Sequence, residues 1–125
     1  MLYSVDTGRY VDKLPHKKDF DKWKNHLSDE DYSKVIEAIN EKIDKSDINT
    51  AGWLPGNNWT DTVFEPLYYA CGRNKVQSGM FFGLIVFNIL MLRPDKVWGF
   101  GRFEKNGAPI SSMTYFVLEN PPKQN

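Results

Sequence analysis

The chain has 125 residues and a mass of 14.5 kDa, which is the length of one domain. A hydrophobic content of 41% and an aromatic content of 14% exclude disorder over most of the chain. Lys and Arg total 16, as do Asp and Glu, which excludes a broadly basic nucleic-acid binder and an acidic tail protein. A single cysteine excludes an internal disulfide framework and a cysteine-based zinc cluster. We therefore expect one α+β domain over residues 1–125.

No targeting or membrane segment is expected. The first residues, Met1–Asp6, have no basic region followed by an apolar run, so they do not resemble a secretory signal. The longest apolar run, Met80–Leu92, is shorter than the roughly 20 residues that a membrane-spanning helix needs. These features predict a cytoplasmic protein without a membrane partner, in which Cys71 is a reduced thiol.

The N-terminal part is predicted to be mainly helical. Residues 1–14 are short and mixed and could form an edge strand or an ordered arm. A short helix over about 17–26 follows, because Phe20 and Trp23 share one face with Leu27. Ser28 is a typical N-cap for a longer helix over 29–45. Its apolar positions have helical spacing: Tyr32, Val35, Ile36, Ile39 and Ile43.

A loop over residues 46–60 separates this helix from the next. Thr62 and Glu65 have the spacing of a capping box, so a helix over 63–72 is expected. Gly72 is the residue type that commonly ends a helix.

The apolar segment 80–92 is ambiguous. As a helix it would start at Ser78 and be apolar on all sides, whereas as a strand it would be buried on both faces. Its aromatic and β-branched residues favour a strand. The sequence of residues 93–96 suits a type I turn that would connect such a strand to the next. A strand over 82–91 is therefore slightly preferred.

A β-hairpin is predicted near the C-terminus. Residues 97–105 and 110–119 flank Asn106-Gly107, which is a strong signal for a hairpin turn. Residues 120–125 contain two prolines and are expected to form a frayed tail. With 82–91, the hairpin would make a small antiparallel meander whose one face is covered by helices 29–45 and 63–72.

Neither face of the predicted hairpin is polar, although a sheet with one solvated face normally alternates strictly. The second face could therefore be covered by the N-terminal arm or by another copy of the chain. This pattern predicts a homodimer. The candidate interface residues are aromatic: Trp98, Phe100, Tyr115 and Phe116.

The residue types that carry chemistry do not form a convincing catalytic or metal-binding set. Cys71 lies on the apolar face of a predicted helix, and neither His16 nor His26 has a spacing that pairs it with Cys71 or with the other histidine. No metal site and no cofactor are expected. The segment Trp98–Phe103 has glycines between aromatic residues, as in the base-stacking strand of RNA-recognition domains, but it lacks that motif's leading basic residue.

The loop over residues 49–61 is the most promising ligand site in the sequence. It places two tryptophans among amides and an acid, a combination that supplies apolar area together with orienting polar groups. The alternative is that both tryptophans cover the core. The candidate ligand-binding residues are Trp53, Asn57, Asn58, Trp59, Asp61, Arg102 and Glu104.

Three functions remain, in decreasing order of preference. The first is a non-enzymatic module that binds a partner protein or itself. The second is a small-molecule binder, or a minor enzyme, with a pocket under residues 49–61. The third is single-stranded nucleic-acid binding through Trp98, Phe100 and Arg102, which the zero net charge disfavours, so no nucleic-acid partner is expected.

Overall fold

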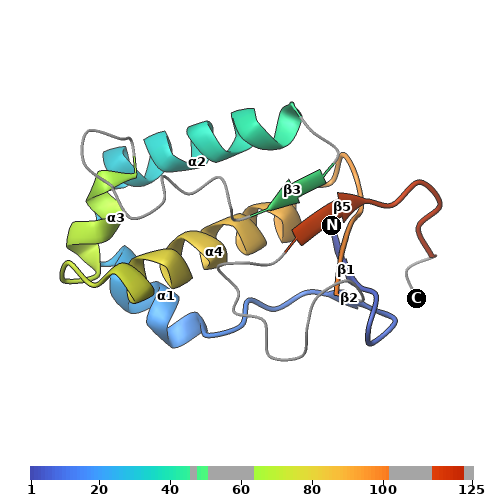
Figure 1. Ribbon diagram of the computed structural model, residues 1–125, viewed down its shortest axis with the longest axis horizontal. Helices are drawn as coiled ribbons and strands as arrows, with labels where there is room; N and C mark the ends of the chain where they lie inside the picture. Colours follow the sequence, from blue (N-terminus) through green and yellow to red (C-terminus); the bar gives the residue numbers. More distant parts are fainter. Residues whose placement is uncertain (46–47, 51–63, 102–113, 123–125) are drawn as a thin grey trace.

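A computed structural model describes residues 1–45, 48–50, 64–101 and 114–122 (Figure 1). The α+β class is confirmed, because four helices accompany one sheet in the described part of the chain. The elements are, in chain order, β1 (Leu2–Ser4), β2 (Arg9–Val11), α1 (Lys17–Lys24), α2 (Asp29–Asp44), β3 (Ile48–Thr50), α3 (Glu65–Ala70), α4 (Lys75–Leu92), β4 (Trp98–Phe100) and β5 (Thr114–Val117).

The central element is α4, and it shows that the strand predicted over 82–91 is wrong. Asn74 begins the helix, because its side-chain oxygen accepts a hydrogen bond from the backbone N–H of Gln77 at 3.0 Å. α1, α2, α3 and β1 all contact α4, which runs between α1 and α2 in Figure 1. Neighbours on several sides allow a helix to be apolar all round, so burial outweighs the strand preference of its β-branched residues.

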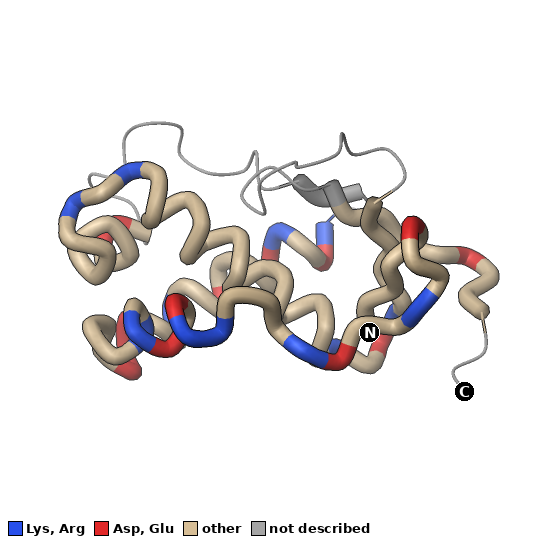
Figure 2. The backbone as a smooth tube through the Cα atoms, turned by 90° about the horizontal axis from the view of Figure 1, so that it is seen from below, with Lys and Arg blue, Asp and Glu red and all other residues tan. Residues whose placement is uncertain are grey.

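The absence of charge inside α4 agrees with this burial. No charged residue occurs from Val76 to Leu92, and Figure 2 shows the charges on the surrounding elements. By length and composition α4 could also cross a membrane, a test that the core helix of a folded protein passes as well. More than half of the helix is buried inside the structure.

The two N-terminal helices follow the prediction closely. α2 lies within the predicted range 29–45, and the Ser28 hydroxyl accepts the N-cap hydrogen bond from the Asp31 N–H at 3.1 Å. α1 is shorter than the predicted 17–26. The rings of Phe20 and Trp23 each lie 5.7 Å from the ring of Phe81, which fixes α1 against α4.

The next helix, α3, is shorter than the predicted range 63–72. Its N-cap is Phe64, which makes no side-chain cap bond, while the predicted capping residue Thr62 lies outside the described residues. Gly72 follows the helix with a φ of 65°, which confirms its predicted role as a helix terminator.

The sheet has the strand order β2-β1-β4-β5-β3 and is mixed, which corrects the predicted antiparallel meander. β1 pairs antiparallel with β2 and parallel with β4. Residues 2–11 are therefore a hairpin inside the sheet and not an arm that covers it. β4 and β5 pair antiparallel, as predicted for 97–105 and 110–119, but their described parts are shorter.

The connections differ from the prediction in two places. Residues 93–96, predicted to join two strands, instead join α4 to β4. The C-terminal tail is held at Pro122, whose carbonyl accepts a hydrogen bond from the Tyr10 hydroxyl. The predicted hairpin turn at Asn106-Gly107 and the last residues, 123–125, lie outside the described part.

The sheet turns one face toward α4. Leu2, Trp98 and Tyr115 are fully buried on this inner face. The ring of Phe100 lies 5.6 Å from that of Phe87 on α4. α2 and α3 pack against α4, so α4 takes the covering position that was predicted for helices 29–45 and 63–72.

Candidate functional site

The residues predicted to bind a small ligand all lie outside the part of the chain that the structure describes: Trp53, Asn57, Asn58, Trp59, Asp61, Arg102 and Glu104. The pocket predicted under residues 49–61 therefore stays a prediction.

The four predicted interface residues separate onto the two faces of the sheet. Trp98 and Tyr115 are fully buried on the inner face. Phe100 is half-buried there, with its ring 6.2 Å from that of Tyr115. Phe116 alternates with Tyr115 along β5 and lies on the opposite face. Of the four, Phe116 is thus the residue that this arrangement directs away from α4.

The outer face of the sheet carries an uncharged row of residues that crosses neighbouring strands. Strand pairing aligns Tyr10 with Tyr3, Tyr3 with Gly99, and Gly99 with Phe116. The rings of Tyr3 and Tyr10 are 5.2 Å apart in an edge-to-face arrangement. Leu118 lies beside Gly99 in the same region. We call Tyr3, Tyr10, Gly99, Phe116 and Leu118 the outer-face row.

Gly99 makes this row possible. A Cβ at this position would lie 2.8 Å from Cε2 of Phe116 and 3.1 Å from Cδ2 of Leu118. Both side chains therefore lie against the bare backbone of β4, an approach that only glycine permits. Every other member of the row is half-buried, so part of each side chain faces outward. At the margin of the face, Asp6 lies against Gly101, which has a φ of 90°.

A hollow of about 500 Å³ opens between the β1–β2 hairpin and the end of α4. Tyr3 and Tyr10 form part of its wall, together with Arg9, Asp12 and the largely exposed Leu92. This volume falls in the range of small-ligand pockets. The neighbouring opposite charges of Arg9 and Asp12 give it no clear preference for an anion or a cation.

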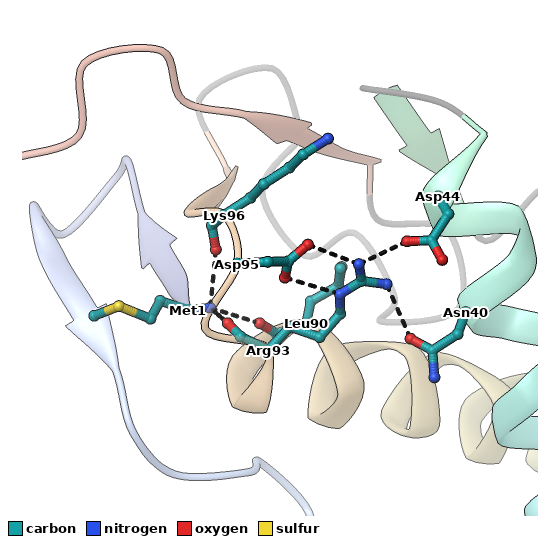
Figure 3. Close-up of polar contacts among 7 residues, drawn as sticks. All are labelled: Met1, Asn40, Asp44, Leu90, Arg93, Asp95 and Lys96. Atoms are coloured by element: carbon teal, nitrogen blue, oxygen red, sulfur yellow. Dashed lines mark hydrogen bonds and ion pairs between the residues drawn. The ribbon is translucent and has the colours of Figure 1, made fainter.

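Arg93, just after α4, is the centre of a cluster of polar side chains (Figure 3). Its guanidinium donates to the side-chain oxygen of Asn40 at 2.9 Å and to Asp44 at 2.6 Å, both on α2. It also forms two hydrogen bonds with Asp95, at 3.0 and 2.7 Å. These hydrogen bonds raise the pKa of Arg93 and lower that of Asp95. The cluster fastens α2 to the end of α4.

The N-terminal ammonium group joins the same region. It donates to the backbone carbonyls of Leu90, Arg93 and Lys96, as Figure 3 shows. Leu90 lies in the last turn of α4, where the carbonyls have no partner within the helix, so the ammonium group satisfies one of these carbonyls. The charges in this region are engaged with one another, and this is the pattern of a structural cluster rather than of a catalytic one.

The chain matches no protein-family model, no curated protein and no solved structure.

The thiol of Cys71 does not have the properties of a nucleophile. The structure brings Cys71 and His26 to the wall of one pocket, which their positions in the sequence did not predict. Burial, however, raises the pKa of the thiol from 9.0 to about 11. Ser78 forms a hydrogen bond with it and opposes this rise only in part. The thiolate required for nucleophilic attack is therefore scarce near neutral pH.

Two other chemistries gain no support from the described residues. Among them, no group of three or more His, Cys, Asp or Glu side chains is placed to hold a metal ion. Base stacking on β4 would require exposed rings, but Trp98 is fully buried and Phe100 faces α4. Arg102, the third residue of that prediction, lies outside the described part.

Tyr3 and Tyr10 are the outer-face residues that the sequence reasoning missed. Their alignment requires the β1–β2 hairpin, which tight pairing of Leu2 with Val11 establishes. The four residues between β1 and β2 include Gly8, which has a φ of 67°. A glycine in a short connection between apolar runs is a hairpin signal that could have identified the pair.

Proposed function

We propose that the protein is a non-enzymatic protein-binding module that associates weakly with a second copy of itself through the outer-face row. The observation that carries this proposal is the uncharged aromatic row across β2, β1, β4 and β5. Two copies can bring such a row together about a two-fold axis without like-charge repulsion, which makes it self-complementary. Aromatic residues are also the type that is enriched in protein interfaces.

The area of the outer-face row sets the expected strength of the association between two copies. The row crosses four strands spaced about 4.8 Å apart, and about three residues along each strand give a strip of roughly 19 by 10 Å. This is well below the area of about 800 Å² per partner that stable complexes bury. The proposed association is therefore a weak, concentration-dependent one, and Asp6 at the margin limits how far the contact extends.

Sedimentation velocity over a wide concentration range tests the proposal. The wild-type protein should shift from monomer to dimer, and Phe116→Lys should stay monomeric. Tyr10→Lys, at the edge of the sheet, is a second disrupting variant that does not disturb the packing over Gly99. Val76→Lys is the matched control, because Val76 is a 78% exposed apolar residue on α4.

The result for each protein either supports or overturns the proposal. A wild-type protein that remains monomeric at the highest concentration would overturn the proposal. So would a folded Tyr10→Lys variant that dimerises like the wild type, or a Val76→Lys variant that loses dimerisation equally. Circular dichroism of each variant establishes that it is folded.

The proposed setting is the cytoplasm, with no nucleic-acid or membrane partner. The zero net charge and the single thiol support this setting. The alternative function, a small-molecule pocket under residues 49–61, involves residues outside the described part and is kept as a second prediction.

A further inference from the structure

A second pocket, of about 310 Å³, lies at the end of the molecule opposite the sheet. It is formed where α1 passes the connection between α3 and α4, and Figure 1 shows these elements at the far end from β1 and β5. Trp23 and Tyr69 contribute aromatic rings, and Ala70 and Cys71 contribute a buried apolar floor. The volume is at the lower end of the range for small-molecule pockets, so it suits a ligand with one or two rings.

The charged groups around this pocket are of one sign. Lys22 lines it from the α1 side, His26 adds an imidazole that can donate a hydrogen bond, and none of the described lining residues is acidic. Arg73 extends the basic character, because its guanidinium lies 5.5 Å from the centre of the Tyr69 ring. The nearby acid Asp21 is engaged by Lys17 at 2.8 Å on the surface of α1. Among the described residues, an anionic group in the pocket would therefore meet the ammonium group of Lys22 without a competing carboxylate in the wall.

The C-terminal ends of α1 and α3 lie beside the pocket, but their carbonyl groups do not offset its positive charge. The backbone carbonyls of Trp23 and Tyr69 already accept hydrogen bonds, from the N–H groups of His26 and Gly72 respectively. The first turn of α4 contains no acid, and Gln77 from this turn adds a side-chain amide to the wall. An amide can donate to a carboxylate oxygen and so orient it.

We infer that this pocket binds a small aryl carboxylate, with its ring between Trp23 and Tyr69 and its carboxylate toward Lys22 and His26. The two chemical features of the ligand follow from the two features of the wall. The rings and the apolar floor favour a flat apolar body, and the ammonium group of Lys22 favours a negative charge. The inference does not depend on the outer-face row, which is at the other end of the molecule.

Benzoate and its neutral analogue benzamide are the probes for a test by titration calorimetry and by amide chemical shifts. A ligand of this size is expected to bind with a dissociation constant no weaker than roughly 10 mM. Benzoate should bind about fivefold more tightly than benzamide, as expected for a partly exposed charge pair. The largest shifts should occur at Cys71, Gly72 and Gln77.

Lys22→Gln and Lys24→Gln form a matched pair of variants. Both remove one positive charge from α1, but Lys24 lies over the Tyr32 ring, 4.8 Å from its centre, and does not line the pocket. Lys22→Gln should weaken benzoate binding about fivefold and leave benzamide binding unchanged, whereas Lys24→Gln should change neither by more than about twofold. The inference would be overturned if benzoate and benzamide bound with equal affinity, or if the two variants weakened benzoate binding equally. It would also be overturned by chemical-shift changes elsewhere in the protein, or by no binding at concentrations up to about 10 mM.

Discussion

Replacing Arg93 with glutamine tests whether the polar cluster at the end of α4 stabilises the fold. The hydrogen bond to Asn40 links parts of the chain 53 residues apart and is partly buried, so its loss should cost about 1.5 kcal/mol. Asp44 and Asp95 are 61% and 44% exposed, which limits each ion pair to about 0.2–1 kcal/mol. The expected decrease in the free energy of unfolding is therefore about 2–3.5 kcal/mol, or roughly 7–13 °C in melting temperature.

Urea unfolding monitored by circular dichroism measures this decrease. Lys17→Gln is the control, because it removes an exposed pair within α1, to Asp21, and should cost no more than about 0.5 kcal/mol. The backbone contacts of residue 93 with Ile89 and with the N-terminal ammonium group are retained in Arg93→Gln. Equal effects of the two substitutions would refute the reasoning.

The pH dependence provides an independent check of the same cluster. Arg93 lowers the pKa of Asp95 below its ordinary value of 3.8 in the folded protein. The resulting stabilisation is present above pH 3.8 and is lost as the pH falls through the lowered value. The stability difference between wild type and Arg93→Gln should therefore shrink in acid, and a difference that is constant down to pH 2 would contradict this assignment.

Two further predictions concern Cys71 and Gly99. The pKa of Cys71 is raised from 9.0 to about 11 in the folded protein, so its stabilising contribution is present below pH 9 and is lost as the pH rises toward 11. Over this range the wild type should lose up to about 3 kcal/mol relative to Cys71→Ala in urea unfolding, and parallel pH profiles would contradict it. Gly99→Ala should destabilise the protein by about 1–2 kcal/mol, because the new Cβ would meet the Phe116 ring. In a Phe116→Ala background, Gly99→Ala should lower the free energy of unfolding much less, because the ring that the new Cβ meets is gone. If the double variant instead lost the full sum of the two single-variant decreases, the proposed contact would be refuted.

Local signals explain what could be predicted from the sequence. The Ser28 cap and the helical spacing of Val35, Ile39 and Ile43 are contained within one segment, and α2 agrees with both. The antiparallel pairing of β4 with β5 likewise follows from strand residues on either side of a turn signal. These features depend on residues that are neighbours in the sequence, so they can be predicted without knowing how distant parts of the chain meet.

The errors arise where distant parts of the chain decide the structure. α4 is apolar on all sides because other elements surround it, so its sequence has no helical period to distinguish it from a buried strand. The parallel pairing of Leu2 with Trp98 has no local signature, and without it the positions of Tyr3 and Phe116 on one face could not be predicted. The pocket beside Trp23 similarly depends on α1 meeting the α3–α4 connection.

The position of β1 between β2 and β4 also has a consequence for biosynthesis. Trp98, the strand partner of Leu2, is synthesised almost a hundred residues after it. At translation rates of about 5–20 residues per second, β1 lacks this partner for about 5–20 seconds. During that interval the nascent hairpin presents an unpaired strand edge, which is a site for unwanted pairing with other chains. The sheet can close only after Trp98 has been synthesised, so slower elongation would prolong the period in which the nascent chain needs protection by chaperones.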